Sequence, residues 1–275
     1  MDFDFEAQDV INEGRTSQKA IEEIKTFISN NEDIPTIPDQ MIVLFLLSCR
    51  NDIEFTEKTI KAYYKCKKNA PEIFDDRDMS KEDLQLALKT VKMASVPRRT
   101  EDNHTVHVLK LDDSNYGNFE LVPIMKASYM LLDVTQQVNP PDGLIVVIDM
   151  KPLRLMHLMK LKIGAIRKYI TFLQEGFPIK LKEIHLLNAV YFVDKVMNIV
   201  KSCMNSELVD MLKIHQSDID MNEFYEKHLS SKYLPSDYGG ELPSVDKLAE
   251  ITLEKLKNRQ AFFDEEERIR KEICK

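Results

Sequence analysis

The chain has 275 residues, enough for one or two domains, and 43% of them are hydrophobic, which is ample for a buried core. Its net charge of −8 argues against a general nucleic-acid binder, because such proteins need a basic surface. Only seven glycines are present, which argues against a protein built on glycine-rich nucleotide-binding loops.

Four helices are predicted in the N-terminal third, each from apolar residues at helical spacing. They cover residues 15–30, Asp39–Cys49, Glu54–Asn69 and Lys81–Met93. The run Met41–Leu47 is apolar on all sides, so this short helix should be central to its module. The polar stretch 94–103 contains Pro97 and is the predicted linker. We therefore expect a small all-helical N-terminal module over residues 1–95.

The middle of the chain alternates between predicted strands and helices. The strands are Thr105–Leu111, Gly143–Asp149 and Lys182–Leu187, and the helices are Glu120–Val138, Leu155–Leu173 and Asp220–Leu229. Gly143–Asp149 is a continuous apolar run, which is typical of a strand buried on both faces of a parallel or mixed sheet. The β-α-β order indicates an α/β domain over residues 96–243. A final helix is predicted from Ser244 to about Arg270 within residues 244–275, and its alternating charges, including the run 265–267, indicate a mostly solvated surface.

The residues after Asn188 have the most regular apolar spacing in the chain. They are Val193, Val196, Met197, Val200, Cys203, Met204, Leu208, Met211 and Leu212. This i, i+3, i+4 spacing predicts one helix of more than five turns. Periodicity alone leaves open whether the apolar stripe packs on a sheet as ordinary core or covers a ligand.

The sequence lacks the recognised motifs for catalysis and metal binding. The four cysteines are far apart and form no CxxC pair, so neither a zinc site nor a redox motif is indicated. His104 and His107 should point to opposite faces of an edge strand, and His157, His185, His215 and His228 are expected to be separate structural residues. No nucleotide-binding or hydrolase motif occurs. We therefore expect no enzyme activity, no metal and no cofactor.

Several short motifs occur in a specific order. They are Asp149 at a strand end, Phe177-Pro178, Ile184–Ala189, Leu234-Pro235 and Tyr238–Gly240. Upstream, Phe45-Leu46, Tyr63-Tyr64 and Pro71–Phe74 complete the pattern. In this order they resemble the CRAL-TRIO lipid-binding family over roughly residues 20–245, and most of all its alpha-tocopherol-transfer-protein-like members. The resemblance implies a helical N-terminal module followed by a β-α-β lipid-binding domain with a helical gate.

The resemblance also implies a set of ligand-binding residues. They are Ile148, Tyr169, Phe172, Leu173, Phe177, Ile179, Ile184, Phe192, Val196, Met197, Val200 and Met204. The last five belong to residues 190–212, here called the gate segment, which in this family covers the lipid cavity. The Tyr169 hydroxyl is a candidate for holding a polar group of the ligand, although core packing is the simpler interpretation.

A second implied site binds phosphoinositide head groups. Lys180, Lys182 and Lys201 match basic positions of the family patch. The patch is incomplete, because Glu207 and Met211 stand where the gate should be basic. In the N-terminal module, the two positions where the family has arginine hold Leu47 and Cys49, and Arg50 is adjacent to Cys49. The alternative interpretation of the three lysines is that they serve solubility.

The function implied is that of a soluble carrier. It would hold one hydrophobic small molecule, such as a tocopherol, retinoid, carotenoid or similar lipid, and transfer it between membranes. The alternative is a phosphoinositide-responsive signalling or membrane-adaptor module, and an enzyme on the same frame would need paired catalytic residues at strand ends. The acidic N-terminus lacks the apolar run of a signal peptide, so a cytoplasmic protein is expected. Its partners would be the lipid and a transient membrane surface, with no nucleic acid.

Overall fold

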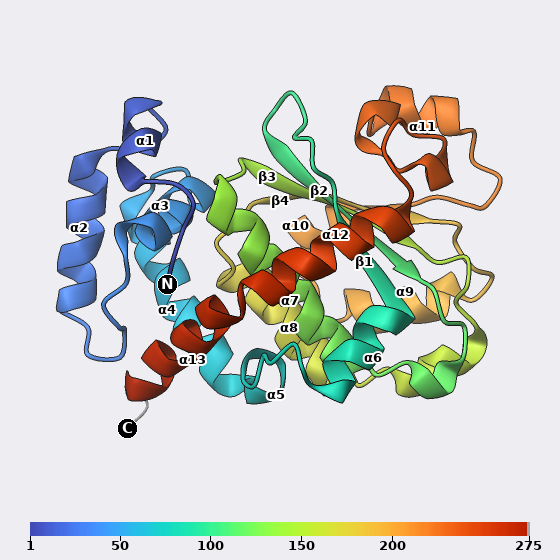
Figure 1. Ribbon diagram of the computed structural model, residues 1–275, viewed down its shortest axis with the longest axis horizontal. Helices are drawn as coiled ribbons and strands as arrows, with labels where there is room; N and C mark the ends of the chain where they lie inside the picture. The colour runs from blue at the N-terminus through green and yellow to red at the C-terminus, as the bar shows by residue number, and fades with distance from the viewer. Residues whose placement is uncertain (274–275) are drawn as a thin grey trace.

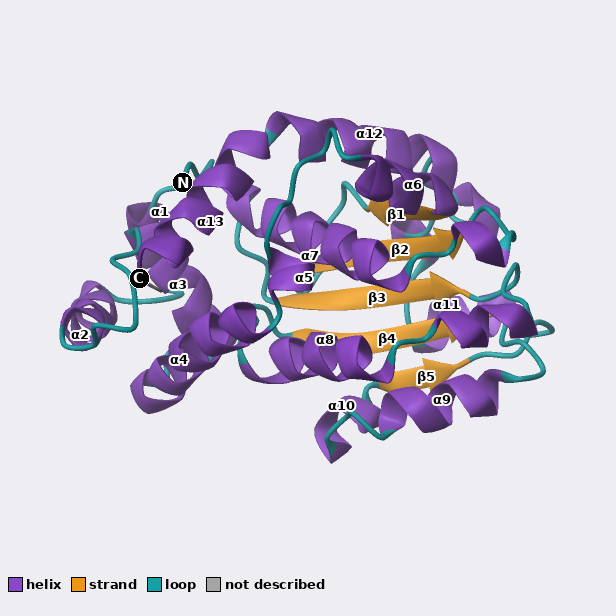
Figure 2. Cartoon of the chain, turned by 90° about the horizontal axis from the view of Figure 1, so that it is seen from below, coloured by secondary structure: helices purple, strands orange, loops and turns teal. Residues whose placement is uncertain are grey.

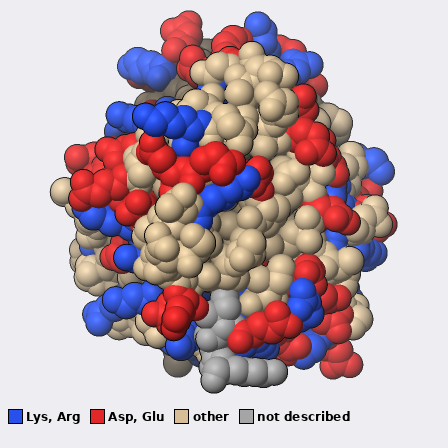
Figure 3. Space-filling model, turned by 90° about the vertical axis from the view of Figure 1, so that its left-hand side faces the viewer, with Lys and Arg blue, Asp and Glu red and all other residues tan. Residues whose placement is uncertain are grey.

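The computed structural model describes residues 1–273 and combines a helical N-terminal module with an α/β domain. The module lies beside the end of the sheet at which strands β3 and β4 begin (Figures 1 and 2). On the face that the module presents, basic and acidic side chains are interspersed around an uncharged area (Figure 3). Among the described residues, no helix combines the length and the apolarity required to cross a bilayer.

The N-terminal module contains five helices. They are α1 (Ala7–Asn12), α2 (Gln18–Ser29), α3 (Asp39–Ser48), α4 (Ile53–Asn69) and α5 (Pro71–Phe74). Side-chain caps fix two of the starts, since Ser17 accepts a hydrogen bond from the backbone N–H of Ala20 and Asp52 accepts one from Phe55. Residues Met41 to Leu46 of α3 are all buried, which confirms the predicted central helix.

The α/β domain is built on one five-stranded sheet. Its strands are β1 (Val91–Ser95), β2 (His104–Leu111), β3 (Gly143–Asp149), β4 (Leu181–Leu187) and β5 (Leu212–Ile214). They lie in the order β1-β2-β3-β4-β5, with β1 antiparallel to β2 and the other pairs parallel. The three predicted strands are confirmed, and β1 and β5 are two further strands.

Strand β1 corrects the prediction of a helix over Lys81–Met93. Helix α6 (Glu82–Thr90) ends at Thr90, and the chain then pairs Val91 with Leu111 and Ser95 with His107. Val91 fits the helical spacing of Leu84 and Leu88, so the pattern runs on past the true helix end. The sheet thus takes a strand from the range assigned to the helical module.

Helices cover both faces of the sheet. Figure 2 shows α7 (Leu121–Val138) and α8 (Ile163–Glu175) across one face, which we call the α8 face. The other face packs against α11 (Met221–Lys227), and α12 (Val245–Asn258) lies along β1. The remaining elements are η1 (Tyr116–Asn118), η2 (Leu155–Lys160), α9 (Val193–Lys201), α10 (Ser206–Asp210), η3 (Ser231–Tyr233), η4 (Ser236–Tyr238) and α13 (Gln260–Ile273).

Alternation along β3 and β4 separates two hydrophobic cores. Leu144 of β3 and Leu186 of β4 belong to the core on the α8 face. Val147 and Leu187 belong to the core on the other face, beside Phe224. Because side chains alternate along a strand, Ile148 and Ile184 must also lie on the α8 face.

The gate segment is not the continuous helix that its spacing predicts. Helix α9 ends at Lys201, α10 covers only Ser206–Asp210, and Leu212 lies in strand β5. The Asn205 side chain accepts a hydrogen bond from the backbone N–H of Leu208 and so starts a new helix. Pairing of Leu212 with Ile184 then draws the chain onto the sheet edge.

The C-terminal region also differs from the prediction of one solvated helix. It forms α12 and α13, which are separated at Arg259. Glu266 lies within the acidic run that was expected to be exposed, yet it is only 4% exposed, and Arg270 is also buried. Cys274 lies outside the described residues.

Glu266 belongs to a buried ionic network between the module and the domain. Its carboxylate lies 2.9 Å from Lys67 Nζ of α4 and also contacts the Arg77 guanidinium, which in turn lies 2.7 Å from Asp133 of α7. Burial acts to raise the pKa of Glu266, but Lys67, Arg77 and Arg270 outweigh it and lower that pKa to about 2. The network therefore joins α4, α7 and α13 through charges that require one another.

Candidate functional site

The predicted ligand-binding residues converge on the α8 face of the sheet. Eleven of the twelve lie in one hydrophobic cluster: Ile148, Tyr169, Phe172, Leu173, Phe177, Ile179, Ile184, Val196, Met197, Val200 and Met204. Phe192, the twelfth, is buried at the start of α9 and stands outside that cluster. Four separate segments thus bring their apolar residues together: β3, β4, α8 with the turn after it, and α9. Whether these residues bind a ligand stays a prediction.

The gate segment buries its apolar stripe only in part. Of the nine stripe residues, three are buried, namely Val193, Met197 and Leu208. The other six are half-buried: Val196, Val200, Cys203, Met204, Met211 and Leu212. A helix that belonged permanently to the core would bury the whole stripe, so this segment leaves apolar surface without a complete partner.

Two predicted residues pack in a way that limits their role. The Tyr169 hydroxyl lies 3.1 Å from Ser128 Oγ on α7, and burial raises its pKa. Phe172 is fully buried among aromatic rings that include Tyr63 of α4 and Phe74 of α5. Phe172 thus connects the module to the domain. The Tyr169 hydroxyl already has a hydrogen-bond partner within the protein.

The motif residues Asp149, Asn188 and Tyr238 meet at the carboxyl end of β3. Asp149 Oδ1 accepts hydrogen bonds from the Asn188 side chain (2.8 Å) and from the Lys151 backbone (2.9 Å). Its Oδ2 accepts one from the Tyr238 hydroxyl (3.1 Å), and burial together with this carboxylate raises the pKa of Tyr238. The carboxylate is therefore committed to joining three segments.

A surface hollow of about 540 Å³ lies between the module and the domain. Leu173, Phe177 and Ile179 of the predicted ligand set line its apolar side, together with Leu208 and Met211. Arg50 and Lys180 line it as well, facing Glu207. Burial lowers the pKa of Lys180, and the neighbouring charges of Lys182 and Arg50 lower it further.

Of the three predicted phosphoinositide-binding lysines, only Lys180 lines this hollow. Lys180 lines the hollow, whereas Lys182 lies at a different depression, beside His104. Lys201 is exposed at the end of α9. Arg50, at positive φ in the turn after α3, is the residue that joins Lys180 instead. Its position beside Cys49 in the sequence is the signal that points to it.

The histidines also differ from the prediction. His107 is buried on the internal strand β2, where its Nε2 lies 3.0 Å from Thr135 Oγ1, so it is not an edge-strand surface residue. His185, His215 and His228 were expected to be separate, yet each pair of their rings lies 5.1–5.3 Å apart. They come from β4, from the turn after β5 and from the end of α11, so only the fold brings them together.

Comparison with known proteins places the two parts of the chain separately. Residues 89–240, more than half of the chain, match the family model described as CRAL/TRIO domain. Residues 13–84 match the model described as Pinta-like, UBA domain.

Individual relatives are distant. Alpha-tocopherol transfer protein-like of Mus musculus is 23% identical over 217 residues, covering 77% of this chain but only 61% of that relative. Clavesin-2 of Homo sapiens is 20% identical over 237 residues, covering 84% of this chain and 71% of the relative. A solved structure, titled crystal structure of Sfh5, has a TM-score of 0.48 at 12% identity and covers 90% of this chain and 92% of its own. On the match over residues 89–240, this chain belongs to the CRAL/TRIO domain family.

Proposed function

We propose that this protein is a non-enzymatic cytoplasmic carrier that binds one hydrophobic small molecule beneath its gate segment and transfers it between membranes. The ligand would lie among the apolar residues of β3, β4, α8 and α9. A tocopherol-like, retinoid-like or other ring-bearing or elongated lipid suits such a lining. The name of the alpha-tocopherol transfer protein-like relative supports this ligand class.

The observation that carries the proposal is the half-buried stripe of the gate segment. Val196, Val200 and Met204 face the cluster yet remain partly exposed. Apolar surface that leaves water stabilises a complex by about 25 cal/mol per Å². A lipid that completed the burial of this stripe would therefore bind without any charged contact.

Exposed apolar side chains support membrane contact during transfer. The segment after β3 exposes Met159 (74%) and Ile163 (52%), and the segment after β4 exposes Tyr191 (85%). Because β3 and β4 are parallel, both segments leave the sheet at the carboxyl ends of these strands. Exposed apolar groups of this size are typical of interaction surfaces, and a bilayer interface would cover them.

Native mass spectrometry and titration with fluorescent lipids test the carrier proposal. We expect saturable 1:1 binding of a lipid from a panel of tocopherols, retinoids, carotenoids, sterols and phospholipids. Val200→Asp should weaken binding at least about tenfold, because it places a charge against the ligand. Asn198→Asp adds the same charge to the exposed side of the same helix and should bind like the wild type.

Circular dichroism of both variants would establish that they are folded. The carrier proposal is wrong if no lipid of the panel binds saturably. It is also wrong if the two variants lose affinity equally, because the gate stripe then has no special contact with the ligand.

A second candidate function is binding of an anionic lipid head group in the hollow between the module and the domain. The specific observation is that Arg50 and Lys180 share this hollow with an apolar wall that includes Leu208 and Met211. Two cations beside apolar side chains suit a phosphate group attached to an acyl chain. Glu207 opposes this role, so the binding should be weak and should decline with salt.

Liposome flotation with and without phosphoinositides separates this candidate from simple membrane contact. Arg50→Ala with Lys180→Ala should reduce the phosphoinositide-dependent part of the binding at low salt. Lys195→Ala with Lys201→Ala removes the same charge from exposed positions on α9 and should leave that part intact. Equal losses in the two double variants would assign the binding to net charge alone.

A further inference from the structure

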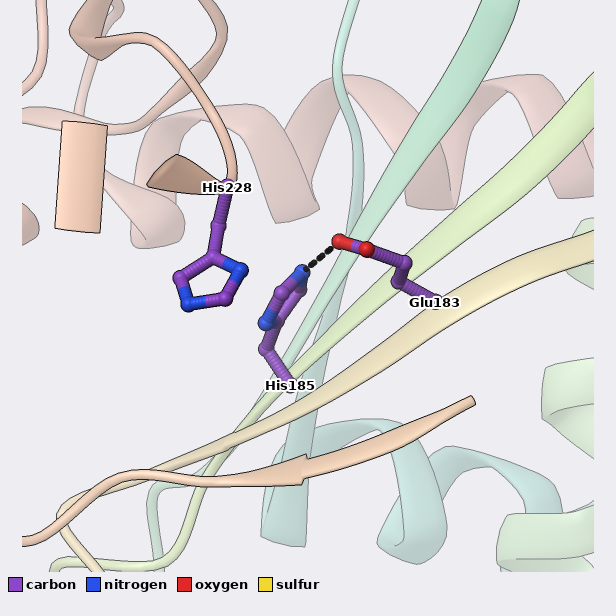
Figure 4. Close-up of side chains that lie close together, drawn as sticks. All are labelled: Glu183, His185 and His228. Carbon is purple, nitrogen blue, oxygen red and sulfur yellow. Dashed lines mark ion pairs between the residues drawn. The ribbon is translucent and has the colours of Figure 1, made fainter. Parts of the chain in front are cut away.

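Strand β4 carries a second group of polar residues on the sheet face opposite the proposed lipid site. Glu183 and His185 are two residues apart on β4 and share that face. His228, which directly follows α11, lies over them, as Figure 4 shows. One ligand atom from each of Glu183, His185 and His228 lies within 4.8 Å of the other two.

His185 is the central member of this group and is fully buried. Its Nδ1 lies 3.0 Å from Nε2 of His215, in hydrogen-bonding geometry. Its Nε2 makes no hydrogen bond to any residue between 1 and 273, although Glu183 Oε2 lies only 2.8 Å away. The carboxylate therefore approaches Nε2 from a direction in which an N–H on that nitrogen does not donate to it.

In one of the two tautomers that the His185–His215 contact allows, this arrangement is unfavourable without a cation but suits a bound metal. When His185 donates from Nδ1 to His215, the lone pair of Nε2 lies next to the negative carboxylate. Two ligands of one zinc ion are each about 2.0–2.2 Å from the metal and lie beside one another at about 3 Å, not in line. The off-line position of Glu183 is the position that a second ligand of the same ion would take.

We propose that Glu183, His185 and His228 bind a divalent transition-metal ion of the zinc type, with His215 as the outer partner that orients His185. Two imidazoles and one carboxylate form a ligand set that zinc accepts, with a further position for water. A hydrogen bond from the remaining ring N–H of a ligating histidine fixes its tautomer and orientation. His215 is placed to accept that hydrogen bond.

Burial disfavours the charged forms of His185 and His215. Burial, with the neighbouring His215, His228 and Lys213, lowers the pKa of His185 to about 3. Burial and His228 also lower the pKa of His215.

The site is open to solvent on one side. Glu183 and His228 line a surface hollow of about 370 Å³, whose rim also contains Glu101, Asp102 and His104. A metal ion can reach Glu183 and His228 through this hollow, and the buried His185 lies next to these two ligands. Glu101 and Asp102 add negative charge at the opening, which attracts cations.

A bound ion would connect the end of α11 to the central sheet, in addition to the strand pairing that already holds β5 on β4. His185 belongs to β4, His215 follows β5 and His228 ends α11. Of the proposed ligands, two lie on β4 and the third directly follows α11, so the ion would tie the end of α11 to β4. Zinc should accordingly raise the thermal unfolding temperature of the protein, because it binds the folded state.

Metal titration of the chelator-treated full chain tests the proposal. Zn²⁺ affinity is measured by competition with a chromophoric chelator, and Co²⁺ serves as a spectroscopic probe of the ligands. Glu183→Gln and His228→Gln change partly exposed ligands and should each weaken binding at least about 100-fold, whereas His215→Gln should cost about 10–100-fold. Circular dichroism of the metal-free variants would show that they fold.

Two controls separate this site from other metal-binding groups. His104→Gln alters the rim of the same hollow, and Glu226→Gln alters an exposed acid on α11, so neither should change the affinity. The proposal is overturned if wild-type protein binds Zn²⁺ no more tightly than Glu183→Gln and His228→Gln. Charge-transfer absorption from a thiolate in the Co²⁺ complex would place the metal at cysteines and would overturn it as well.

Discussion

At the scale of single residues, the Asp149 carboxylate joins three segments of the chain through hydrogen bonds. Its two oxygens hold Asn188, which follows β4 at positive φ, and Tyr238 of the closing segment. The backbone next to Tyr238 requires glycine, because a Cβ on Gly240 would lie 1.9 Å from the Leu234 carbonyl oxygen. In this chain the motif residues therefore join separate segments at the carboxyl ends of β3 and β4, where the gate segment leaves the sheet.

Removing the Tyr238 hydroxyl tests this joint. Tyr238→Phe should lower the free energy of unfolding by about 1.5–3 kcal/mol, because it removes a buried hydrogen bond to a charged group. Tyr225→Phe, in which the lost hydrogen bond goes to the neutral Tyr238 carbonyl, should cost only about 0.5–1.5 kcal/mol. Urea denaturation measures both values, and equal costs would contradict a special role for Asp149.

Glu266 makes a prediction that depends on pH. Glu266→Gln leaves Lys67 and Arg77 buried without their carboxylate, so the free energy of unfolding should fall by about 3–5 kcal/mol at pH 7. The pKa of Glu266 is about 2 in the folded protein, below its ordinary value of 4.5. Its contribution is therefore fully present above about pH 4.5 and is lost as the pH falls towards 2.

Denaturation of wild type and Glu266→Gln at several pH values measures this difference. The gap should be constant from pH 7 to about 5 and should narrow below pH 4.5. Glu265→Gln changes the adjacent, half-buried acid, which pairs with the exposed Arg268, and should shift the unfolding midpoint far less. A gap that widens on acidification would contradict the assigned pKa direction.

At the scale of elements, the gate segment is a chain of short pieces with different degrees of attachment. Helix α9 packs mainly on α8 and leaves half of its stripe partly exposed, whereas β5 is paired with β4. Opening would therefore displace α9 and α10 while β5 stays on the sheet. The free energy needed for opening is set by the apolar surface that becomes exposed to water, at about 25 cal/mol per Å².

Hydrogen exchange can follow this motion. Amides of Val193–Lys201 should exchange faster than those of α8 in ligand-free protein, and they should slow when lipid is bound, because the ligand favours the closed state. Anionic liposomes should speed the exchange of α9 but not of β5. Equal protection of α9 with and without lipid would make it a fixed core element.

The sequence predicts an element well where burial sets the spacing of its apolar residues. It predicts an element poorly where hydrogen bonding to a neighbouring strand determines the structure. Gly143–Asp149 was predicted with its actual limits, since a continuous apolar run fits a strand buried on both faces. Strands β1 and β5 have five and three residues, too few for the alternation of a strand to be recognised. In both cases the apolar residues continue the helical spacing of the preceding helix. Capping by Asn205 broke a periodicity that alone predicted one long helix.

The same contrast applies to the sites. Ile148 and Ile184 could be placed on one face because alternation along a strand is reliable. Two partners of Glu266, Lys67 and Arg77, lie 199 and 189 residues away along the chain, and its local partner Arg270 gave no sign of burial by itself. Glu183 and His185 were close enough for alternation to place them together, but His228 joins them only through the fold.

At the scale of the whole molecule, the helical module is joined to the α/β domain by close backbone contact as well as by charges. A Cβ on Gly176, at the end of α8, would lie 2.8 Å from backbone atoms of Tyr63 on α4. Beside this point, Phe172 packs against Tyr63 and Phe74 of the module. The hollow with Arg50 and Lys180 depends on this contact, because its two walls belong to the two parts.

Two glycines of the same helix region test how much this contact matters. Gly176→Ala should lower the free energy of unfolding by about 1–3 kcal/mol, because the new methyl group must push α4 away from α8. Gly164, near the start of α8, has open space around it, so Gly164→Ala should raise stability by about 0.5–1 kcal/mol through reduced chain entropy. Thermal and urea unfolding of the two variants measure the opposite signs.

Because Gly176→Ala also shifts the walls of the hollow, it should weaken phosphoinositide-dependent flotation, whereas Gly164→Ala should leave it intact. Stabilisation by both substitutions would mean that α4 and α8 can separate freely, and the close junction of module and domain would then be unimportant for stability.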